Sequence, residues 1–582
     1  MFLMIVPPAT TSGSSLFLIE AGLTLIAVAL AFAIPSGGRA LFAPIERVFS
    51  HLARQKGLAV LVVGFSDIFL RLAILPLFPI PHPIVTDDFS FLLAADTFAS
   101  GRLTNPTPVM WQNFESIHID MLPTYMSMYF PGQGLMLAAG KVVLGNPWWG
   151  VLIVTALMCS AICWMLQAWM PPTWALLGGF IAVLHIGLFS YWVNTYHAGS
   201  IMAFGGALIL GAFPRFKRHL YWRDSFLLGL GIVLLVLSRP YEGLLLCLPV
   251  GFVLVRWTFF SKDRPALGKL LRRSAVPLAL VTAAVAWMGY YDYRVFGNPL
   301  TPPYSINRAT YASAPYYIWQ SARPEPAYRH QVMRKFYEDD ELHIFEKIHS
   351  PAGFLPQTIL KGFCGLLFFA GFLLLPPLVM VHRVFRDRRI RFLVVVVLVT
   401  TAGLLIEIFL IPHYLAAITA AFYAIGLQAM RHLRFWKPGN QPVGQGIVRL
   451  IVLFLIFTCG IRLFSGPLHL TATHWPSADW NVIWYGPGNY GQPRADIQSR
   501  LEALPNKQLV IVRYSQDHVP YVEWVYNAPD IDSAKVVWAR EMDVANNTML
   551  IQYYKDRKVW LVQPDLNPEE LQPYPGLKQP SP

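Results

Sequence analysis

The sequence has little charge and little cysteine for its length, and each shortage excludes a class of protein. Only 14% of the 582 residues are charged, whereas 55% are hydrophobic, which is too apolar for a soluble protein of this size. The segments between the apolar runs contain no cysteine, so they hold no disulfide framework. No Walker A loop, strand-linked GxGxxG, HExxH or CxxC occurs, so soluble nucleotide-dependent chemistry has no support. All of the cysteines lie within apolar runs, without metal-ligand spacing to histidine: Cys159, Cys163, Cys247, Cys364 and Cys459.

Long apolar runs instead predict an all-α polytopic membrane protein. A helix needs about 20 mostly apolar residues to cross a bilayer. The first run follows an uncharged N-terminus without a basic region, so we interpret it as an anchor rather than a cleaved signal peptide. We expect twelve spans, at 15–35, 58–80, 148–169, 173–191, 198–213, 225–238, 243–260, 275–291, 357–381, 392–411, 414–430 and 447–464.

The net charge of +13 by itself would suggest nucleic-acid binding, but the basic residues cluster between the apolar runs, as membrane topology requires. With twelve spans, all the strongly basic connections fall on one side of the membrane, which the positive-inside rule identifies as the cytoplasm. Both termini then lie on the extracytoplasmic side, and we expect a bacterial inner membrane. The basic connections centre on residues 39–56, 215–223, 256–273, 383–391 and 431–449.

Three external segments, 81–147, 292–356 and 465–582, are long enough to carry function or a separate domain. We predict a transmembrane domain over 1–464 and a small extracytoplasmic α/β domain over 465–582. Its strands alternate with helices, which is typical of an α/β arrangement. The Pro- and Gln-rich tail after Pro564 is predicted to be flexible. The expected elements are a helix at 495–504, strands at 509–513 and 535–539, a helix at 549–555 and a strand at 558–562.

An acidic pair, Asp87 and Asp88, stands just after the second span. Carboxylates are costly to keep near lipid, so such a pair is a functional-site hypothesis. A carboxylate within hydrogen-bond reach can accept the proton of an attacking hydroxyl, which makes the pair a candidate for the catalytic residues. The alternative is structural, because Thr86, Asp87 or Asp88 can cap the helix that starts near Phe89.

Three features are candidates for binding an anionic group. Arg239 lies at an external helix end, and its guanidinium fork suits phosphate oxygens; the alternative is an ion pair with Glu242 that closes a helical hairpin. Residues 125–134 (YMSMYFPGQG) hold a Pro-Gly turn whose amides near Gly132 can cradle an anion, or which is an ordinary helix-entry turn. Arg308, in the second external segment, is a further candidate of the same type.

Several polar residues approach the external side and are expected to line a substrate cavity. No cofactor is required by this interpretation. The same residues leave room for a divalent cation shared with Asp88, although single histidines at span ends are more often interfacial. Most tyrosines and tryptophans near the span ends are expected in the aromatic belt. The expected cavity residues are Glu115, His118, Tyr129, His197, Glu242, Glu407 and His413.

Taken together, these features resemble the GT-C superfamily of membrane glycosyltransferases. The branch that looks most similar holds bacterial relatives of protein O-mannosyltransferases and of lipid A aminoarabinose transferases. The resemblance covers about residues 58–430. It rests on the acidic pair that opens the first external loop, the Leu-Leu-Ala-Ala stretch at 92–95, the turn at 129–134 (YFPGQG), and the multi-span topology with an external C-terminal module.

The resemblance implies transfer of a sugar from a polyprenyl-phosphate donor to an acceptor hydroxyl on the extracytoplasmic face, with Asp87 as the base. The implied partners are the lipid-linked donor, a glycan, lipid or protein acceptor, and membrane lipids, but no nucleic acid. The family often has a lysine near the lipid phosphate, where this chain has Met128, and a proline where it has Phe130. We expect Arg239 to compensate. A transporter or flippase of lipid-linked glycans and a catalytically silent assembly protein remain as alternatives.

Overall fold

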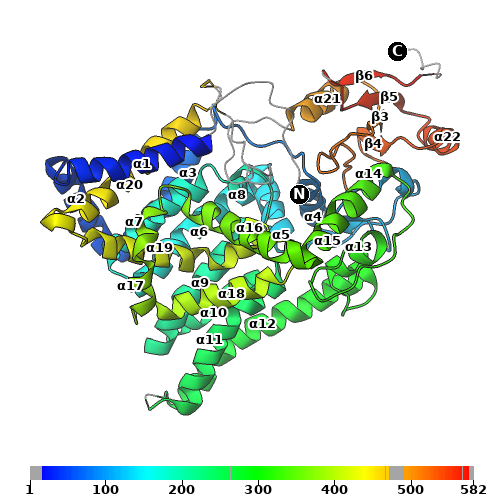
Figure 1. Cartoon of the computed structure of the whole chain (residues 1–582). Coiled ribbons are helices and arrows are strands. Elements are labelled where there is room, and N and C mark those ends of the chain that lie inside the picture. The colour runs from blue at the N-terminus through cyan, green and yellow to red at the C-terminus, as the bar shows by residue number, and fades with distance from the viewer. Residues whose placement is uncertain are drawn as a thin grey trace.

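The computed structural model describes residues 16–37, 39–262, 264–465, 467–468, 470, 491–566 and 568–575. The predictions for the uncharged N-terminus and for the last part of the tail fall outside these residues. The fold is a large body of helices with a small sheet at one end (Figure 1). The longer apolar helices form the body, and the sheet comes from the C-terminal part of the chain.

The helical body is built from chain positions 16–463. Its α-helices are α1 (Leu16–Ala33), α2 (Arg39–Arg54), α3 (Lys56–Ala73), α4 (Thr86–Ala99), α5 (Pro131–Leu144), α6 (Trp148–Trp169), α7 (Pro172–Ala182), α8 (Tyr191–Asn194), α9 (Gly199–His219), α10 (Trp222–Val236), α11 (Pro240–Phe260), α12 (Leu267–Phe296), α13 (Pro303–Tyr311), α14 (Gln331–Arg334), α15 (His343–His349), α16 (Pro351–Ala370), α17 (Val381–Arg386), α18 (Arg391–Leu405), α19 (Thr419–Arg434) and α20 (Val443–Leu463). Short 3-10 or π turns are η1 (Trp111–Phe114), η2 (Val183–Gly187), η3 (Lys335–Leu342), η4 (Pro376–Met380), η5 (Pro412–Ile418) and η6 (Pro438–Asn440).

Seven helices among the described residues are long and apolar enough to cross a membrane. Each overlaps a predicted span, and three shorter apolar helices overlap other predicted spans. The expectation of a helical membrane protein is therefore confirmed, whereas the count of twelve spans stays a prediction. The seven are α6, α9, α11, α12, α16, α20 and the continuous helix Pro412–Arg434.

The predicted span 357–381 does not exist as one helix. Helix α16 starts earlier, at Pro351, and ends at Ala370. Gly371 follows with φ 54°, and two prolines open the 3-10 turn η4 soon after. Proline lacks the amide hydrogen that a continuing helix needs, so the apolar run folds as two separate pieces.

The predicted span 392–411 also ends early, because α18 stops at Leu405. The residues that follow pair with the second external segment instead: the Ile408 amide donates to the Tyr316 carbonyl at 2.8 Å, and the Ile318 amide donates to the Ile406 carbonyl at 3.1 Å. Glu407 therefore lies in an extended segment at a helix end, not inside a spanning helix.

The C-terminal module (residues 491–575) contains a four-stranded sheet in the order β4-β3-β5-β6. Strand β3 is parallel to both β4 and β5, and β6 is antiparallel to β5. Each helix and strand predicted here overlaps an observed one, although most of their ends are shifted. Strand β6 was not predicted, because its polar sequence carries no strand pattern. It lies in the tail after Pro564, so the prediction of a flexible tail is wrong for residues 570–573, which pair with β5. The elements are α21 (Gln492–Glu502), β3 (Gln508–Val512), β4 (Val536–Arg540), α22 (Val544–Tyr553), β5 (Lys558–Gln563) and β6 (Glu570–Pro573).

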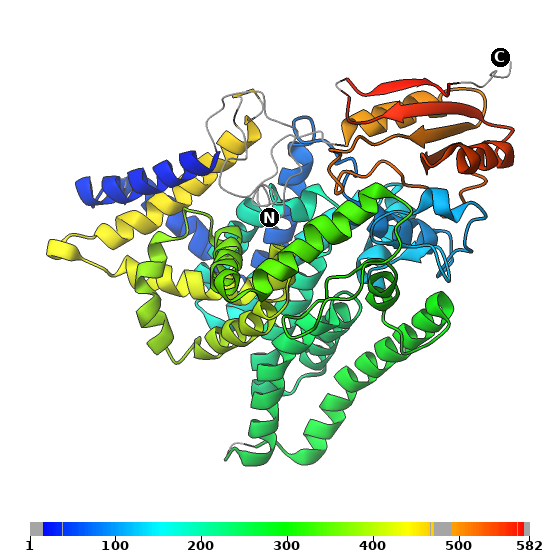
Figure 2. The ribbon, with the colours of Figure 1, turned by 45° about the vertical axis from the view of Figure 1, so that its right-hand side comes forward.

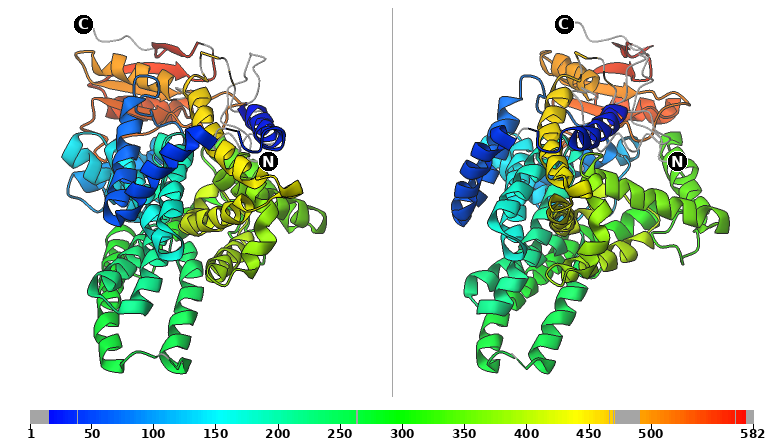
Figure 3. Two further views of the ribbon diagram at one scale, coloured as in Figure 1. Left: turned by 90° about the vertical axis from the view of Figure 1, so that its left-hand side faces the viewer. Right: turned by 60° about the vertical axis from the view of Figure 1, so that its left-hand side comes forward.

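The two faces of this sheet pack on different partners. Side chains alternate along each strand, so Val510 and Val512 pack with α21, whereas Leu509 and Ile511 share a core with α22 and with the first external segment. The residues of that segment in the shared core are Leu93, Phe114, Ile119, Met121 and Tyr125. Figure 2 shows the module resting on this segment, and Figure 3 shows it at the end opposite the junction of α11 and α12.

Candidate functional site

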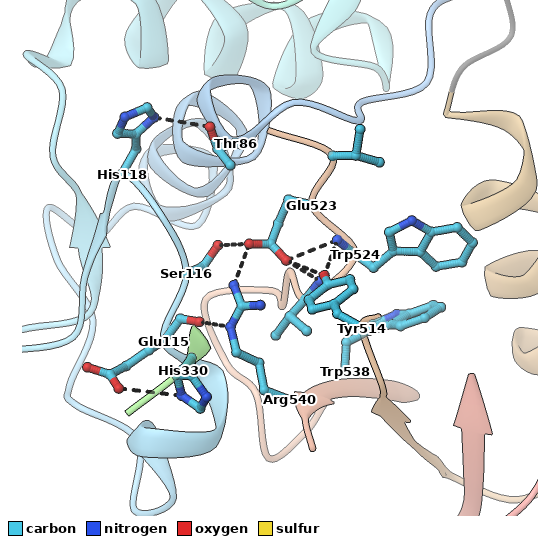
Figure 4. Close-up of polar contacts among 12 residues, drawn as sticks. Thr86, Glu115, Ser116, His118, His330, Tyr514, Glu523, Trp524, Trp538 and Arg540 are labelled. Atoms are coloured by element: carbon cyan, nitrogen blue, oxygen red, sulfur yellow. Dashed lines mark hydrogen bonds and ion pairs between the residues drawn. The ribbon is translucent and has the colours of Figure 1, made fainter. Parts of the chain in front are cut away.

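Helix α4 begins at Thr86 and carries both acids in its first turn, where the helix dipole favours negative charge. The Tyr129 hydroxyl donates to Oδ1 of Asp87, and Nδ1 of His118 lies 3.6 Å from Oδ2 of the same carboxylate. The Thr86 hydroxyl lies 3.2 Å from that imidazole nitrogen (Figure 4). The side chain of Asp87 is 25% exposed, so the carboxylate is held from two sides and still reaches solvent.

Asp88 has a different environment from its neighbour. Its side chain is only 3% exposed, and its Oδ1 accepts the Tyr196 amide hydrogen at 3.0 Å and lies 3.3 Å from Nδ1 of His197. The N-cap of α4 is Val85, which makes no side-chain capping bond. The pair is thus divided: Asp88 ties α4 to the turn between α8 and α9, and Asp87 stays accessible.

A line of polar groups continues from Asp88 to Arg239. The rings of His197 and His413 lie 5.4 Å apart, and Nε2 of His413 lies 3.3 Å from Nη2 of Arg239. Arg239 donates from Nη1 to Glu242 at 2.6 Å. The fold therefore brings eight of the predicted site residues together: Asp87, Asp88, His118, Tyr129, His197, Arg239, Glu242 and His413.

Arg239 makes the ion pair with Glu242 that was the structural alternative, and it also lies 3.7 Å above the Tyr414 ring. Stacking on an aromatic face fixes the guanidinium plane. Tyr304 is a second tyrosine near the site, and its ring centroid lies 5.6 Å from that of Tyr129. Sequence reasoning missed both tyrosines, although Tyr414 follows His413 directly and Tyr304 closes the proline-rich run 298–304.

Burial and neighbouring charges shift the pKa values of Asp87, His118 and His197 in different directions. Burial raises the pKa of Asp87. The charges of His118, His197 and Arg239 and the hydrogen bond from Tyr129 together lower it by more, so the net pKa is below the usual carboxyl value. Burial lowers the pKa of His118 more than Asp87 raises it. Burial also lowers the pKa of His197, but Asp88 and Asp87 raise it above its usual value. Because its pKa is lowered, Asp87 is a carboxylate at neutral pH.

Gly132 does not provide a free anion-binding amide. Its amide donates to the Leu237 carbonyl at 2.7 Å, so the donor is already used. A Cβ at this position would lie 2.5 Å from Oγ of Ser238. Gly132 instead lets the start of α5 approach the end of α10. The prediction that its amide cradles an anion is therefore wrong.

Arg308 is likewise occupied. It donates to Glu341 at 2.5 Å and to the Ala314 carbonyl, and its guanidinium lies 4.8 Å from the Tyr316 ring centroid. Arg308 is only 5% exposed. Its contacts hold the second external segment together, so it is not placed to bind a phosphate directly.

Glu115 and Glu407 lie away from the line of polar groups. Glu115 accepts from Tyr311 at 2.9 Å and from Arg329 at 3.2 Å, beneath the C-terminal module. Glu407 is within electrostatic range of Arg239 and Glu242, at the margin of the site. Among the residues that the structure describes, no group of three or more His, Cys, Asp and Glu side chains has a metal-binding arrangement.

The fold and site define a helical membrane protein with a carboxylate centre under an α/β module. No protein-family model and no curated protein sequence matches it. Among solved structures, it is similar to ArnT from Cupriavidus metallidurans in the apo state, with TM-score 0.48 and 13% identity over 86% of this chain and 92% of that chain.

Two further solved structures are similar to this chain. The same ArnT bound to undecaprenyl phosphate has TM-score 0.43 and 14% identity over 86% of this chain and 92% of that chain. The Archaeoglobus fulgidus oligosaccharyltransferase with a tethered acceptor peptide has TM-score 0.45 and 10% identity over 87% and 69%. Both proteins are members of the GT-C superfamily, which the sequence resembles.

Proposed function

We propose that this protein is a membrane glycosyltransferase that moves a sugar from a polyprenyl-phosphate donor to an acceptor hydroxyl, with Asp87 as general base. The observation that carries the proposal is the division of the acidic pair. Asp87 is partly exposed, charged and held by Tyr129 and His118, whereas Asp88 is buried and occupied. A positioned carboxylate with a free edge is what proton abstraction from a hydroxyl requires.

The proposed reaction is a direct displacement that inverts the anomeric configuration. The acceptor oxygen forms a bond to the anomeric carbon while the bond from that carbon to the phosphate oxygen breaks. Asp87 takes the hydroxyl proton, and the polyprenyl phosphate leaves with the bonding electrons. Because phosphate is a good leaving group, the protein must supply mainly orientation and charge stabilisation.

Arg239 is the residue proposed to stabilise the departing phosphate. Its guanidinium is fixed between Glu242, His413 and the Tyr414 ring, so its orientation is set before the donor binds. The pair with Glu242 already neutralises part of its charge, and the phosphate would share the fork with that carboxylate. We propose that Arg239 compensates for Met128, which occupies the sequence position where the family pattern often has a lysine. The reaction needs no cofactor in this scheme.

The acceptor is proposed to approach on the extracytoplasmic face, where the C-terminal module would orient it. A glycan, a lipid or a protein hydroxyl fits this proposal equally. We also propose that the membrane is a bacterial inner membrane and that both termini are extracytoplasmic. The support for this orientation is the excess of basic residues in the connections on one side.

The test is sugar transfer by the purified protein in lipid, with a panel of polyprenyl-phosphate sugars, for the wild type and Asp87→Asn. The matched control is Asp96→Asn on the same helix, whose carboxylate pairs with Lys141 at 2.7 Å, away from the site. We expect transfer by the wild type and the control and at least a 100-fold loss in Asp87→Asn, within the range of general-base contributions. Equal transfer by all three would remove Asp87 as the base. Lipid-linked glycan translocation that survives Asp87→Asn, without transfer, would favour a flippase.

A further inference from the structure

Glu523 of the C-terminal module is a buried carboxylate with every acceptor position occupied. It is 2% exposed, as is its ion-pair partner Arg540, at 2.5 Å. A buried ion pair contributes little net stability, because desolvation offsets its Coulomb attraction, so its value lies in fixed geometry. The donors to Glu523 besides Arg540 are Tyr514 Oη at 2.8 Å, the amides of Trp524 at 3.0 Å and Val525 at 2.8 Å, and Ser116 Oγ at 2.9 Å (Figure 4).

This pair holds the first external segment just before His118. Ser116 donates its hydroxyl to Oε2 of Glu523, and Nε of Arg540 donates to the Glu115 carbonyl at 2.5 Å. Two consecutive residues are thus fixed by one ion pair from a distant part of the chain. His118 lies two residues further on, so its backbone starts from a position that the module sets.

The module also holds the extended segment that leads into α4. The Glu523 amide donates to the Ile84 carbonyl at 2.9 Å, and Val522 forms an antiparallel bridge with Val85. Phe89, in the first turns of α4, stacks on Tyr526 with ring centroids 4.8 Å apart. The same short stretch of the module, 522–526, therefore reaches the residues on both sides of the acidic pair.

His118 depends on such support because its backbone is in the left-handed region, with φ 66°. A non-glycine residue keeps that conformation only where its surroundings enforce it. Its carbonyl accepts from Ser90 Oγ at 2.6 Å and from the Met128 amide at 3.2 Å. With Ser116 anchored, these bonds set the distance between the imidazole and Asp87.

We infer that the Glu523–Arg540 pair is a positioning device for the reaction centre, through which the C-terminal module holds His118 against Asp87. This inference rests on the proposed function. Neither residue touches the reacting atoms; both act through Glu115, Ser116 and the segment at 84–85. The module is thus required for turnover itself, separately from any role in binding the acceptor.

The test compares Glu523→Gln with Glu541→Gln, in the full-length protein in lipid. Glu541 is the matched control, because it forms an exposed ion pair with Arg513 at 2.6 Å on the same module, one residue after Arg540. The measurements are kcat and KM for donor and acceptor, with kcat expressed per donor-binding site, and hydrogen-deuterium exchange of peptides that cover 84–90 and 115–119.

We expect Glu523→Gln to lower kcat about 10-fold or more, as small misplacements of catalytic groups do, with both KM values within two-fold of wild type. Exchange should be faster in both peptides, and the control should match wild type in every measurement. Unchanged kcat and exchange would overturn the inference. A change confined to acceptor KM would also overturn it, because the pair would then serve acceptor binding.

Ser116→Ala separates the inference from a folding defect, because it removes one hydroxyl from the opposite side of the contact. Faster exchange at 115–119 and a smaller fall in kcat are expected, and wild-type behaviour would count against the inference. If no variant, wild type included, transfers sugar from any donor, the proposed function fails. Exchange at the two peptides then still decides whether the pair holds the centre.

Discussion

Tyr129 donates its hydroxyl hydrogen to Asp87 across a sequence separation of 42 residues, joining the approach to α5 to the first turn of α4. This bond distinguishes the two acids, because Asp88 turns away to the Tyr196 amide. A carboxylate that accepts a hydrogen bond and keeps an exposed edge has a set orientation and remains available to a substrate.

Tyr129→Phe is expected to move the acid limb of the activity profile to higher pH. The hydroxyl stabilises the charged form of Asp87 and helps to hold its pKa below the usual value. A general base is active when deprotonated, so activity is lost as pH falls through that pKa, and the loss begins at higher pH once the pKa rises. The kcat/KM profile for donor, with Tyr553→Phe on the exposed side of α22 as control, measures the shift. Superimposable acid limbs would contradict it.

Asp88→Asn is expected to retain far more transfer activity than Asp87→Asn. The amide oxygen of asparagine can still accept the Tyr196 amide hydrogen, whereas alanine leaves that buried donor unpaired at a cost of about 1–3 kcal/mol. Asp88→Ala should therefore lower the thermal unfolding midpoint, and Asp88→Asn should lower it less. Side-by-side activity and melting curves test both statements. Full activity in Asp87→Asn with none in Asp88→Asn would reverse the assignment of the base.

Arg239→Ala is expected to weaken donor binding about 10-fold, which corresponds to about 1.4 kcal/mol and lies near the range for hydrogen bonds to charged groups. Glu242→Gln is the matched comparison: it removes the charge that competes for the guanidinium, so donor affinity should stay the same or increase. Binding of a radiolabelled polyprenyl-phosphate sugar measures both variants. If Arg239→Ala bound the donor as tightly as the wild type, Arg239 would not be the residue that binds the phosphate.

Gly132→Ala is expected to destabilise the protein by about 1–3 kcal/mol through overpacking. The added Cβ would lie 2.5 Å from Oγ of Ser238 and 2.8 Å from the Leu237 carbonyl oxygen, and the backbone cannot yield as a side chain can. Gly251→Ala is the control, since no atom lies within 4 Å of a Cβ there. Thermal unfolding in one detergent compares the two. Equal midpoints would show that the start of α5 has room to move.

The local features of this molecule could be predicted from its sequence. The length of the apolar runs predicts the long apolar helices, and alternating strand and helix patterns predict the elements of the C-terminal module except β6, because both patterns depend on neighbours in the chain. The sequence predicts the acidic pair just ahead of a helix that starts near Phe89, whereas α4 starts at Thr86 and holds the pair in its first turn. The breaks after α16 and α18 were missed. The second of these depends on pairing with residues 316–318, far away in sequence.

The composition and the long apolar runs of the chain are sufficient to define a helical membrane protein with an acidic pair after its second apolar run. Tertiary packing decided which acid is exposed, that the Gly132 amide is already used, and that Glu523 contacts Ser116 across 407 residues. These outcomes depend on burial and on donors brought in from other elements. Hydrophobic pattern reports the environment of a segment, whereas the partner of a polar side chain is set only when distant segments meet.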